Sequence, residues 1–146
     1  FYKRRDYSRV VNGRNPIVAH EYLGDSVEGK TVFIADDIIA SGESMLEVAS
    51  NLKARGAKRI IADATFPLFT SGLDKFDKAV EEGTLDYVVG TNLTYRKPEL
   101  LNRDWYVDVD VSKYAAYFIV ALNHDMSVSS IIDPIKKIEA LLASRK

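Results

Sequence analysis

Short, largely apolar runs alternate with amphipathic stretches along most of this sequence, and that alternation constrains the fold more than any other feature. The runs at 31–35, 59–65 and 87–89 are rich in residues that favour strands buried in a parallel sheet. The stretches between them place apolar residues at helical spacing, and a glycine ends each one. Strands that alternate with helices predict an α/β layer fold with a mostly parallel sheet.

The remaining elements complete a single domain of this class. The sequence predicts a fourth strand over 105–111, a helix from Ser112 to about Asn123, and a last helix that begins at Asp133 and Pro134. A chain of 146 residues fits one such domain, which we expect to have three layers.

Composition excludes several classes of function. The chain has no cysteine, which rules out disulfides, thiolate metal sites and cysteine nucleophiles and fits a reducing compartment such as the cytoplasm. Its formal net charge of −1 argues against a nucleic-acid partner bound through a broad basic face. The longest wholly apolar run, 115–122, is much shorter than the roughly 20 residues that span a bilayer, so we expect no membrane partner.

The beginning of the chain differs in charge from the rest. Residues 1–14 contain five basic residues and one acidic residue, which suggests a segment that handles anions. We therefore expect residues 1–30 to form a basic arm and linker and residues 31–146 to form the domain. Because the sequence begins at Phe1 and not at a recognisable domain start, we also expect that a segment upstream of it is missing.

The segment after the first predicted strand combines two kinds of chemistry. Asp36 and Asp37 offer only acceptors, which suit the vicinal hydroxyls of a sugar or a Mg²⁺ ion. The turn at 40–44 is rich in small residues and precedes a helix, where backbone N–H groups favour a phosphate. A turn of this kind also caps helices without binding a ligand. The adjacent acids gain nothing from packing, and they favour a sugar-phosphate site.

Three segments together resemble a known family. They are V-F-I-A-D-D-I-I-A-S-G-E-S at 32–44, Lys3-Arg4-Arg5 upstream, and A-T-F-P-L-F-T-S-G at 64–72. The first is similar to the phosphoribosyl-binding motif of type I phosphoribosyltransferases. The three segments, in their order along the chain, resemble the C-terminal half of the ribose-phosphate pyrophosphokinases. This resemblance implies a phosphoribosyltransferase-like α/β fold.

The resemblance implies an activity and a set of site residues. The family transfers the diphosphoryl group of ATP to the C1 hydroxyl of ribose 5-phosphate, giving phosphoribosyl pyrophosphate (PRPP) and AMP, with Mg²⁺ as cofactor. Lys3 and Arg5 would then be catalytic residues on a mobile loop. The protein would associate with copies of itself to form dimers that assemble into hexamers. This half alone would be inactive. The implied ribose 5-phosphate ligands are Asp36, Asp37, Ala40, Ser41, Gly42, Glu43 and Ser44.

Departures from the family pattern keep two alternatives open. Ala40 stands where the family usually has an acid, and Glu43 adds a negative charge at the start of the phosphate-binding helix, where we expect it to weaken phosphate binding. A non-catalytic regulatory subunit of the same fold is therefore one alternative. The other is a phosphoribosyltransferase that consumes PRPP. The loop at 91–96 is a further candidate for contact with substrate or diphosphate.

Overall fold

The computed structural model describes residues 2–5 and 17–144, with side chains from residue 22 onward. The chain divides into two compact units, residues 1–108 and 109–146.

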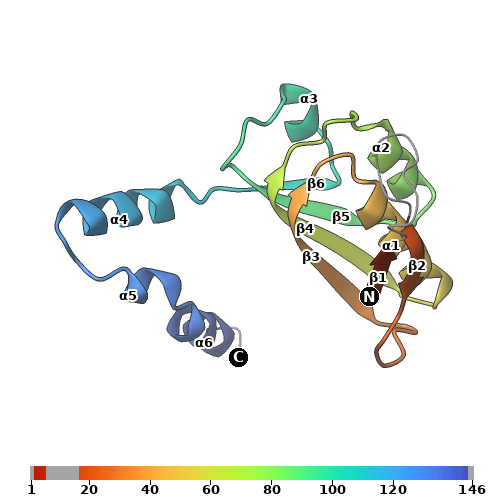
Figure 1. Ribbon diagram of the computed structural model, residues 1–146, viewed down its shortest axis with the longest axis horizontal. Helices are drawn as coiled ribbons and strands as arrows, with labels where there is room; N and C mark the ends of the chain where they lie inside the picture. The colour runs from red at the N-terminus through yellow and green to blue at the C-terminus, as the bar shows by residue number, and fades with distance from the viewer. Residues whose placement is uncertain (1, 6–16, 145–146) are drawn as a thin grey trace. The chain divides into compact units, whose positions relative to one another are not determined.

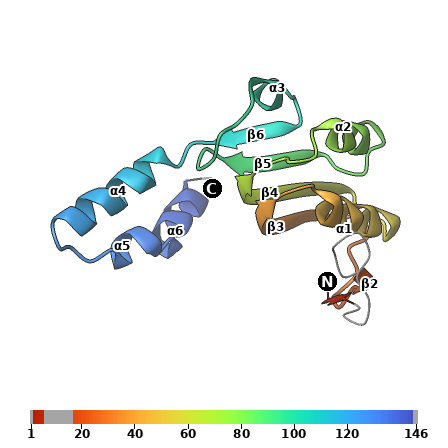
Figure 2. The same cartoon turned by 45° about the horizontal axis from the view of Figure 1, so that its top comes forward.

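The main sheet of the first unit has four strands in chain order, β3-β4-β5-β6 (Figure 2). β3 pairs with β4 in parallel, and β4 pairs with β5 in parallel. Parallel neighbours require a connection that returns along the sheet, and right-handed connections in this order place their helices on the same face. The strands are β3 (Thr31–Ile39), β4 (Arg59–Pro67), β5 (Tyr87–Thr91) and β6 (Tyr106–Val109).

Two helices among the described residues of this unit pack against the sheet and share one core with it, to which a third, short helix adds Leu100. They are α1 (Glu43–Ala54) and α2 (Asp74–Glu81), which lie next to each other in Figure 1, and the short α3 (Pro98–Leu101) follows β5. Phe76 of α2 and Ile60 and Val88 of the sheet are fully buried in this core. Other members come from α1 and β4, namely Met45, Ala49, Leu52, Ala62 and Ala64.

The α/β fold with a parallel sheet, predicted from the sequence, is confirmed. The third expected layer, helices on the face of the sheet opposite to α1 and α2, stays a prediction. β3 is longer than predicted, because Ile38 and Ile39 continue the pairing with β4 as far as Pro67. Asp36 and Asp37 therefore lie within the strand and not beyond its end.

The N-terminal segment contains a pair of strands that were not predicted from the sequence. β1 (Tyr2–Arg5) and β2 (Ile17–Glu21) pair antiparallel, with Lys3 opposite His20. The predicted division between residues 1–30 and 31–146 stays a prediction.

The second unit is helical. It contains α4 (Ser112–Asn123), followed by α5 (Ser129–Ile132) and α6 (Ile135–Ala143) (Figure 2). The last helix begins two residues later than predicted, with Pro134 at its N-cap position, and the N–H of its first residue, Ile135, donates to the carboxylate of Asp133 at 3.0 Å. Among the helices described, none has both the length and the apolar character needed to cross a membrane.

Candidate functional site

The acidic pair, Asp36 and Asp37, lies exposed in the second half of β3. The backbone N–H of Asp37 donates to Oδ1 of Asp36 at 2.9 Å, which fixes the orientation of the first carboxylate relative to the second residue. Both residues are exposed, so their remaining oxygen atoms can accept from a ligand. This pair supplies acceptors for hydroxyl groups or a divalent cation.

The turn that follows β3 begins α1 without a side-chain cap. Gly42 occupies the N-cap position in the left-handed region, with φ of 78°, and its carbonyl oxygen accepts the first helical bond from the N–H of Leu46. The N–H groups in the first turn of any helix lack partners within that helix, and the helix dipole favours negative charge there. The turn at 40–44 therefore has the local geometry of a phosphate cradle, and it is called the cradle from here on.

Residues of the acidic pair and of the turn line a common cavity of about 250 Å³. Six of the seven residues predicted to bind ribose 5-phosphate contribute to its lining; they are Asp36, Asp37, Ala40, Ser41, Gly42 and Ser44. Glu43 is not among the lining residues. Its carboxylate instead forms an ion pair with Lys75 of α2, with 2.6 Å between Nζ and Oε1. The structure thus brings sugar-type and phosphate-type binding groups into one site.

Backbone hydrogen bonds from the β4–α2 loop hold the cradle in place. The N–H groups of Leu68 and Phe69 donate to the carbonyl oxygen of Ile39 at 2.9 and 3.1 Å, and the N–H of Thr70 donates to that of Ala40 at 2.9 Å. These bonds fix the backbone on both sides of the point where β3 ends and the turn begins.

The side chain beneath the cradle is Phe76, which is fully buried. A Cβ atom at Gly42 would overlap Cε2 and Cζ of that ring, so only glycine fits at this contact. The ring of Phe76 is stacked on Trp105, at 5.9 Å between centroids and 20° between planes, and it meets the edge of Phe69 at 4.9 Å. The aromatic cluster of Phe69, Phe76 and Trp105 therefore fixes how closely the turn can approach the core.

Asp77 anchors this aromatic cluster through charge-assisted hydrogen bonds. Its carboxylate accepts from Nε1 of Trp105 at 2.7 Å and from Nε and Nη2 of Arg103, each at 2.9 Å. Burial alone would raise the pKa of Asp77, but the hydrogen bonds from Arg103 and Trp105, together with the Arg103 charge, outweigh it and leave that pKa below its ordinary value.

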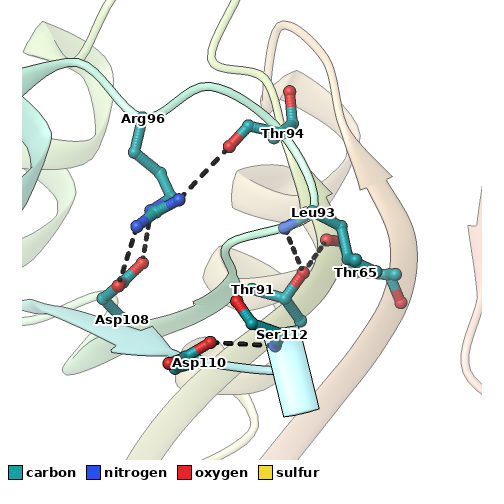
Figure 3. Close-up of polar contacts among 8 residues, drawn as sticks. All are labelled: Thr65, Thr91, Leu93, Thr94, Arg96, Asp108, Asp110 and Ser112. Carbon is teal, nitrogen blue, oxygen red and sulfur yellow. Dashed lines mark hydrogen bonds and ion pairs between the residues drawn. The ribbon is translucent and has the colours of Figure 1, made fainter. Parts of the chain in front are cut away.

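Two polar side chains of the loop at 91–96 bond to other parts of the chain. Oγ1 of Thr91 donates to the carbonyl oxygen of Thr65 at 2.7 Å and accepts from the N–H of Leu93 at 3.2 Å (Figure 3). The guanidinium of Arg96 pairs with Asp108, with Nε 2.7 Å from Oδ1 and Nη2 3.2 Å from Oδ2. Contact of this loop with substrate stays a prediction, and its arginine is held by a carboxylate of the same chain.

A second cavity, of about 340 Å³, lies between the β4–α2 loop and the segment around α3. Apolar side chains such as Leu68, Phe69 and Leu100 line it, together with Tyr95 and Lys97. This cavity was not predicted from the sequence, because its two walls are about thirty positions apart and no local pattern links them.

The predicted catalytic residues Lys3 and Arg5 lie on β1. Their side chains are outside the described part of the structure, so their predicted role stays a prediction.

Comparisons with known proteins identify relatives in the family that the sequence motifs resemble. The family model of the phosphoribosyl transferase domain matches residues 1–92. A ribose-phosphate pyrophosphokinase of Shewanella oneidensis is 30% identical over 129 residues, which is 88% of this chain and 38% of that protein. An orotate phosphoribosyltransferase of Oceanobacillus iheyensis is 41% identical over 64 residues, which is 44% of this chain and 30% of that protein.

A solved structure supports the fold. The phosphoribosylpyrophosphate synthetase of Mycobacterium smegmatis superposes with a TM-score of 0.59 at 23% identity, over 77% of this chain and 34% of that one. The chain spans less than two fifths of the length of the pyrophosphokinases that it matches. The family match covers both the acidic pair and the cradle, and the chain belongs to the phosphoribosyl transferase domain family.

Proposed function

We propose that this chain is the C-terminal half of a ribose-phosphate diphosphokinase and that residues 36–44 bind ribose 5-phosphate. The complete protein would transfer the β,γ-diphosphoryl group of ATP to the C1 hydroxyl of ribose 5-phosphate and release AMP. The relatives that cover most of this chain are named ribose-phosphate pyrophosphokinases, which supports this reaction over others of the family.

The observation that carries the proposal is the single cavity lined by both the acidic pair and the cradle. A sugar phosphate has hydroxyl groups at one end and a dianion at the other. Asp36 and Asp37 offer acceptors to the hydroxyls, whereas the first turn of α1 offers N–H groups and a favourable dipole to the phosphate. The two kinds of group that line the cavity therefore match the two ends of this ligand.

The acidic pair also fits a Mg²⁺ ion that is shared with substrate. Proteins usually hold Mg²⁺ through one or two carboxylates together with phosphate oxygens and water. Over the described side chains, no group of three or more His, Cys, Asp or Glu residues could hold a metal ion by itself. When bound, Mg²⁺ would neutralise charge on the phosphates of ATP.

Lys3 and Arg5 are the proposed source of further positive charge during transfer. Charge develops on the transferred phosphorus and on the departing AMP, and preorganised cations stabilise it. Cytoplasmic location and assembly of dimers into hexamers belong to the same proposal.

A phosphoribosyltransferase that uses PRPP is the second candidate. The orotate phosphoribosyltransferase match, at 41% identity, favours it over the span that it covers. Ala40 disfavours it, since the resemblance implies an acid at this position that assists base chemistry in many such enzymes.

The test is an assay of the complete protein with ATP, Mg²⁺ and ribose 5-phosphate. We expect AMP and PRPP to form in equal amounts, and only when ribose 5-phosphate is present. Absence of AMP formation would refute the diphosphokinase. Release of diphosphate from PRPP on addition of a nucleobase would support the second candidate instead.

A further inference from the structure

The wall of the second cavity is also the segment that supports the cradle. Leu68 and Phe69 line this cavity, and their N–H groups donate to the carbonyl oxygen of Ile39. Phe69 has a φ of 45°, in the left-handed region that residues other than glycine rarely adopt. Backbone strain of this kind persists only where the surroundings impose it, and it is frequent at ligand sites. A molecule in the cavity would therefore contact a strained segment that holds the cradle.

The interior of this cavity is apolar, and an exposed aromatic ring belongs to its lining. The side chains of Phe69, Leu73 and Leu100 are buried, whereas Leu68 and Tyr95 are 44% and 78% exposed. Aromatic faces attract both apolar rings and cations. The volume of about 340 Å³ lies near the lower end of the range for small-molecule pockets, which is about 300–1,000 Å³. It suits one ring with a short chain attached.

The charges around the cavity favour a cation over an anion. Hydrogen bonds to Asp77 and the charge of that residue raise the pKa of Arg103, although burial lowers it. The charges of Glu99 and Asp74 raise it further, so three carboxylates act on one guanidinium. Among the described residues that line the cavity, Lys97 is the only other cation. One negative charge is left over, which should attract an amine and repel a phosphate or a carboxylate.

We propose that this cavity binds a small aromatic amine and that its occupation strengthens the binding of ribose 5-phosphate at the cradle. The first part goes beyond the proposed function and is independent of it. The second part rests on the proposed binding of ribose 5-phosphate at residues 36–44.

The coupling follows from the backbone that the two sites share. A ring packed against Leu68 and Phe69 restricts the loop to the conformation in which both N–H groups hold the carbonyl oxygen of Ile39. A second ligand then loses less conformational freedom when it binds the cradle. We expect each ligand to raise the affinity of the other by the same factor, about fivefold.

Three probes of the same shape separate charge from apolar contact. Phenethylamine, phenethyl alcohol and hydrocinnamate share a ring and a short chain, and they differ in carrying a positive charge, no charge and a negative charge. We expect the amine to bind about two- to fivefold more tightly than the alcohol, and the alcohol more tightly than the acid. A purely apolar site would bind the amine and the alcohol equally.

Two variants assign the binding to this cavity. Asp74→Asn with Glu99→Gln removes two carboxylates of the lining and should abolish the preference for the amine without changing the affinity for the alcohol. Tyr95→Ala should weaken the binding of all three probes, and it should not affect folding because the ring is mostly exposed. The control is Glu81→Gln with Glu82→Gln, which changes the net charge equally at exposed positions of the chain outside the lining.

Calorimetric titration of the 146-residue chain with the three probes tests the first part. Binding in the expected order, altered by the two lining variants and not by the control, would support it. Absence of binding by a folded wild-type chain, or equal affinity for the amine and the alcohol, would overturn it and leave the proposed function untouched.

Titration with ribose 5-phosphate, with and without saturating phenethylamine, tests the second part. Tighter binding in the presence of the amine would support the coupling, and unchanged affinity would overturn it. If ribose 5-phosphate does not bind in either condition, the proposed function fails together with the coupling, while the titration with the three probes still decides whether the cavity binds an amine.

Discussion

Replacement of Gly42 by alanine should destabilise the fold directly beneath the proposed phosphate site. The new Cβ would approach Cε2 and Cζ of Phe76 well inside the 3.0 Å limit that real Cβ atoms respect, and the residue would keep a φ of 78°. A left-handed conformation costs a non-glycine residue about 1–2 kcal/mol. Forcing a methyl group into a packed core typically costs another ~1–3 kcal/mol. We therefore expect the free energy of unfolding to fall by about 2–5 kcal/mol.

The assay is urea denaturation followed by tryptophan fluorescence. Trp105 is the only tryptophan of the chain and is stacked on Phe76, so its emission reports on the first unit and on the contact in question. A decrease below about 0.5 kcal/mol, the range of neutral surface substitutions, would refute the packing argument.

A second variant separates the clash from the backbone strain. Phe76→Leu removes the ring atoms that the new methyl group would meet, so the double variant with Gly42→Ala should be more stable than the sum of the single effects by at least ~1 kcal/mol. Additive effects would show that the strain at φ 78°, and not the ring of Phe76, accounts for the loss.

Two further predictions follow from the surroundings of the aromatic cluster. Asp77→Asn removes a charged acceptor, which should reduce the free energy of unfolding by about 1 kcal/mol at neutral pH, because the carboxylate is only partly buried. Since the pKa of Asp77 is lowered in the folded state, this difference should be complete above the ordinary carboxyl value of 3.8 and shrink as the pH falls below it; a difference that persists in acid would contradict the assignment. Burial, followed by the nearby charge of Asp108, raises the pKa of Tyr106 to about 12 although Arg96 lowers it, and the hydroxyl has no hydrogen-bond partner among the described residues. Tyr106→Phe should therefore be neutral or stabilising near pH 7, and the wild type alone should lose this group's contribution as the pH rises from 10 towards 12; parallel alkaline unfolding curves for the two proteins would argue against it.

The parts of the site that the sequence predicts well are contiguous in the chain. The acidic pair, the small-residue turn and the following helix lie within residues 36–54, so hydrophobic periodicity and helix-start chemistry are enough to place them together. The alternation of strands and helices likewise predicts the parallel sheet. The lengths of the strands differ from the prediction, that of β3 most of all, because pairing with β4 carries it past the carboxylates to Ile39.

The parts that the sequence does not predict depend on contacts between distant residues. Glu43 is expected to weaken phosphate binding as long as its neighbours in the chain are considered alone, and its pairing with Lys75 becomes visible only when α2 packs beside α1. The need for glycine at position 42 likewise comes from Phe76, which lies 34 positions further along the chain. No local pattern distinguishes these two residues of α2 from an ordinary amphipathic helix.

The central claim is that residues 36–44 bind ribose 5-phosphate, and calorimetric titration of the chain with this sugar phosphate tests it most directly. The variant to compare is Asp36→Asn with Asp37→Asn, which keeps the size of both side chains but removes the charged acceptors for the ribose hydroxyls. The control is Asp104→Asn. It replaces an exposed carboxylate that lies just before β6, at the opposite end of the sheet.

We predict saturable binding with one site per chain, loss of binding in the Asp36 and Asp37 variant, and no change in the Asp104 variant. Equal binding by the wild type and the Asp36 and Asp37 variant would contradict the claim, as would the absence of binding by a folded wild-type chain.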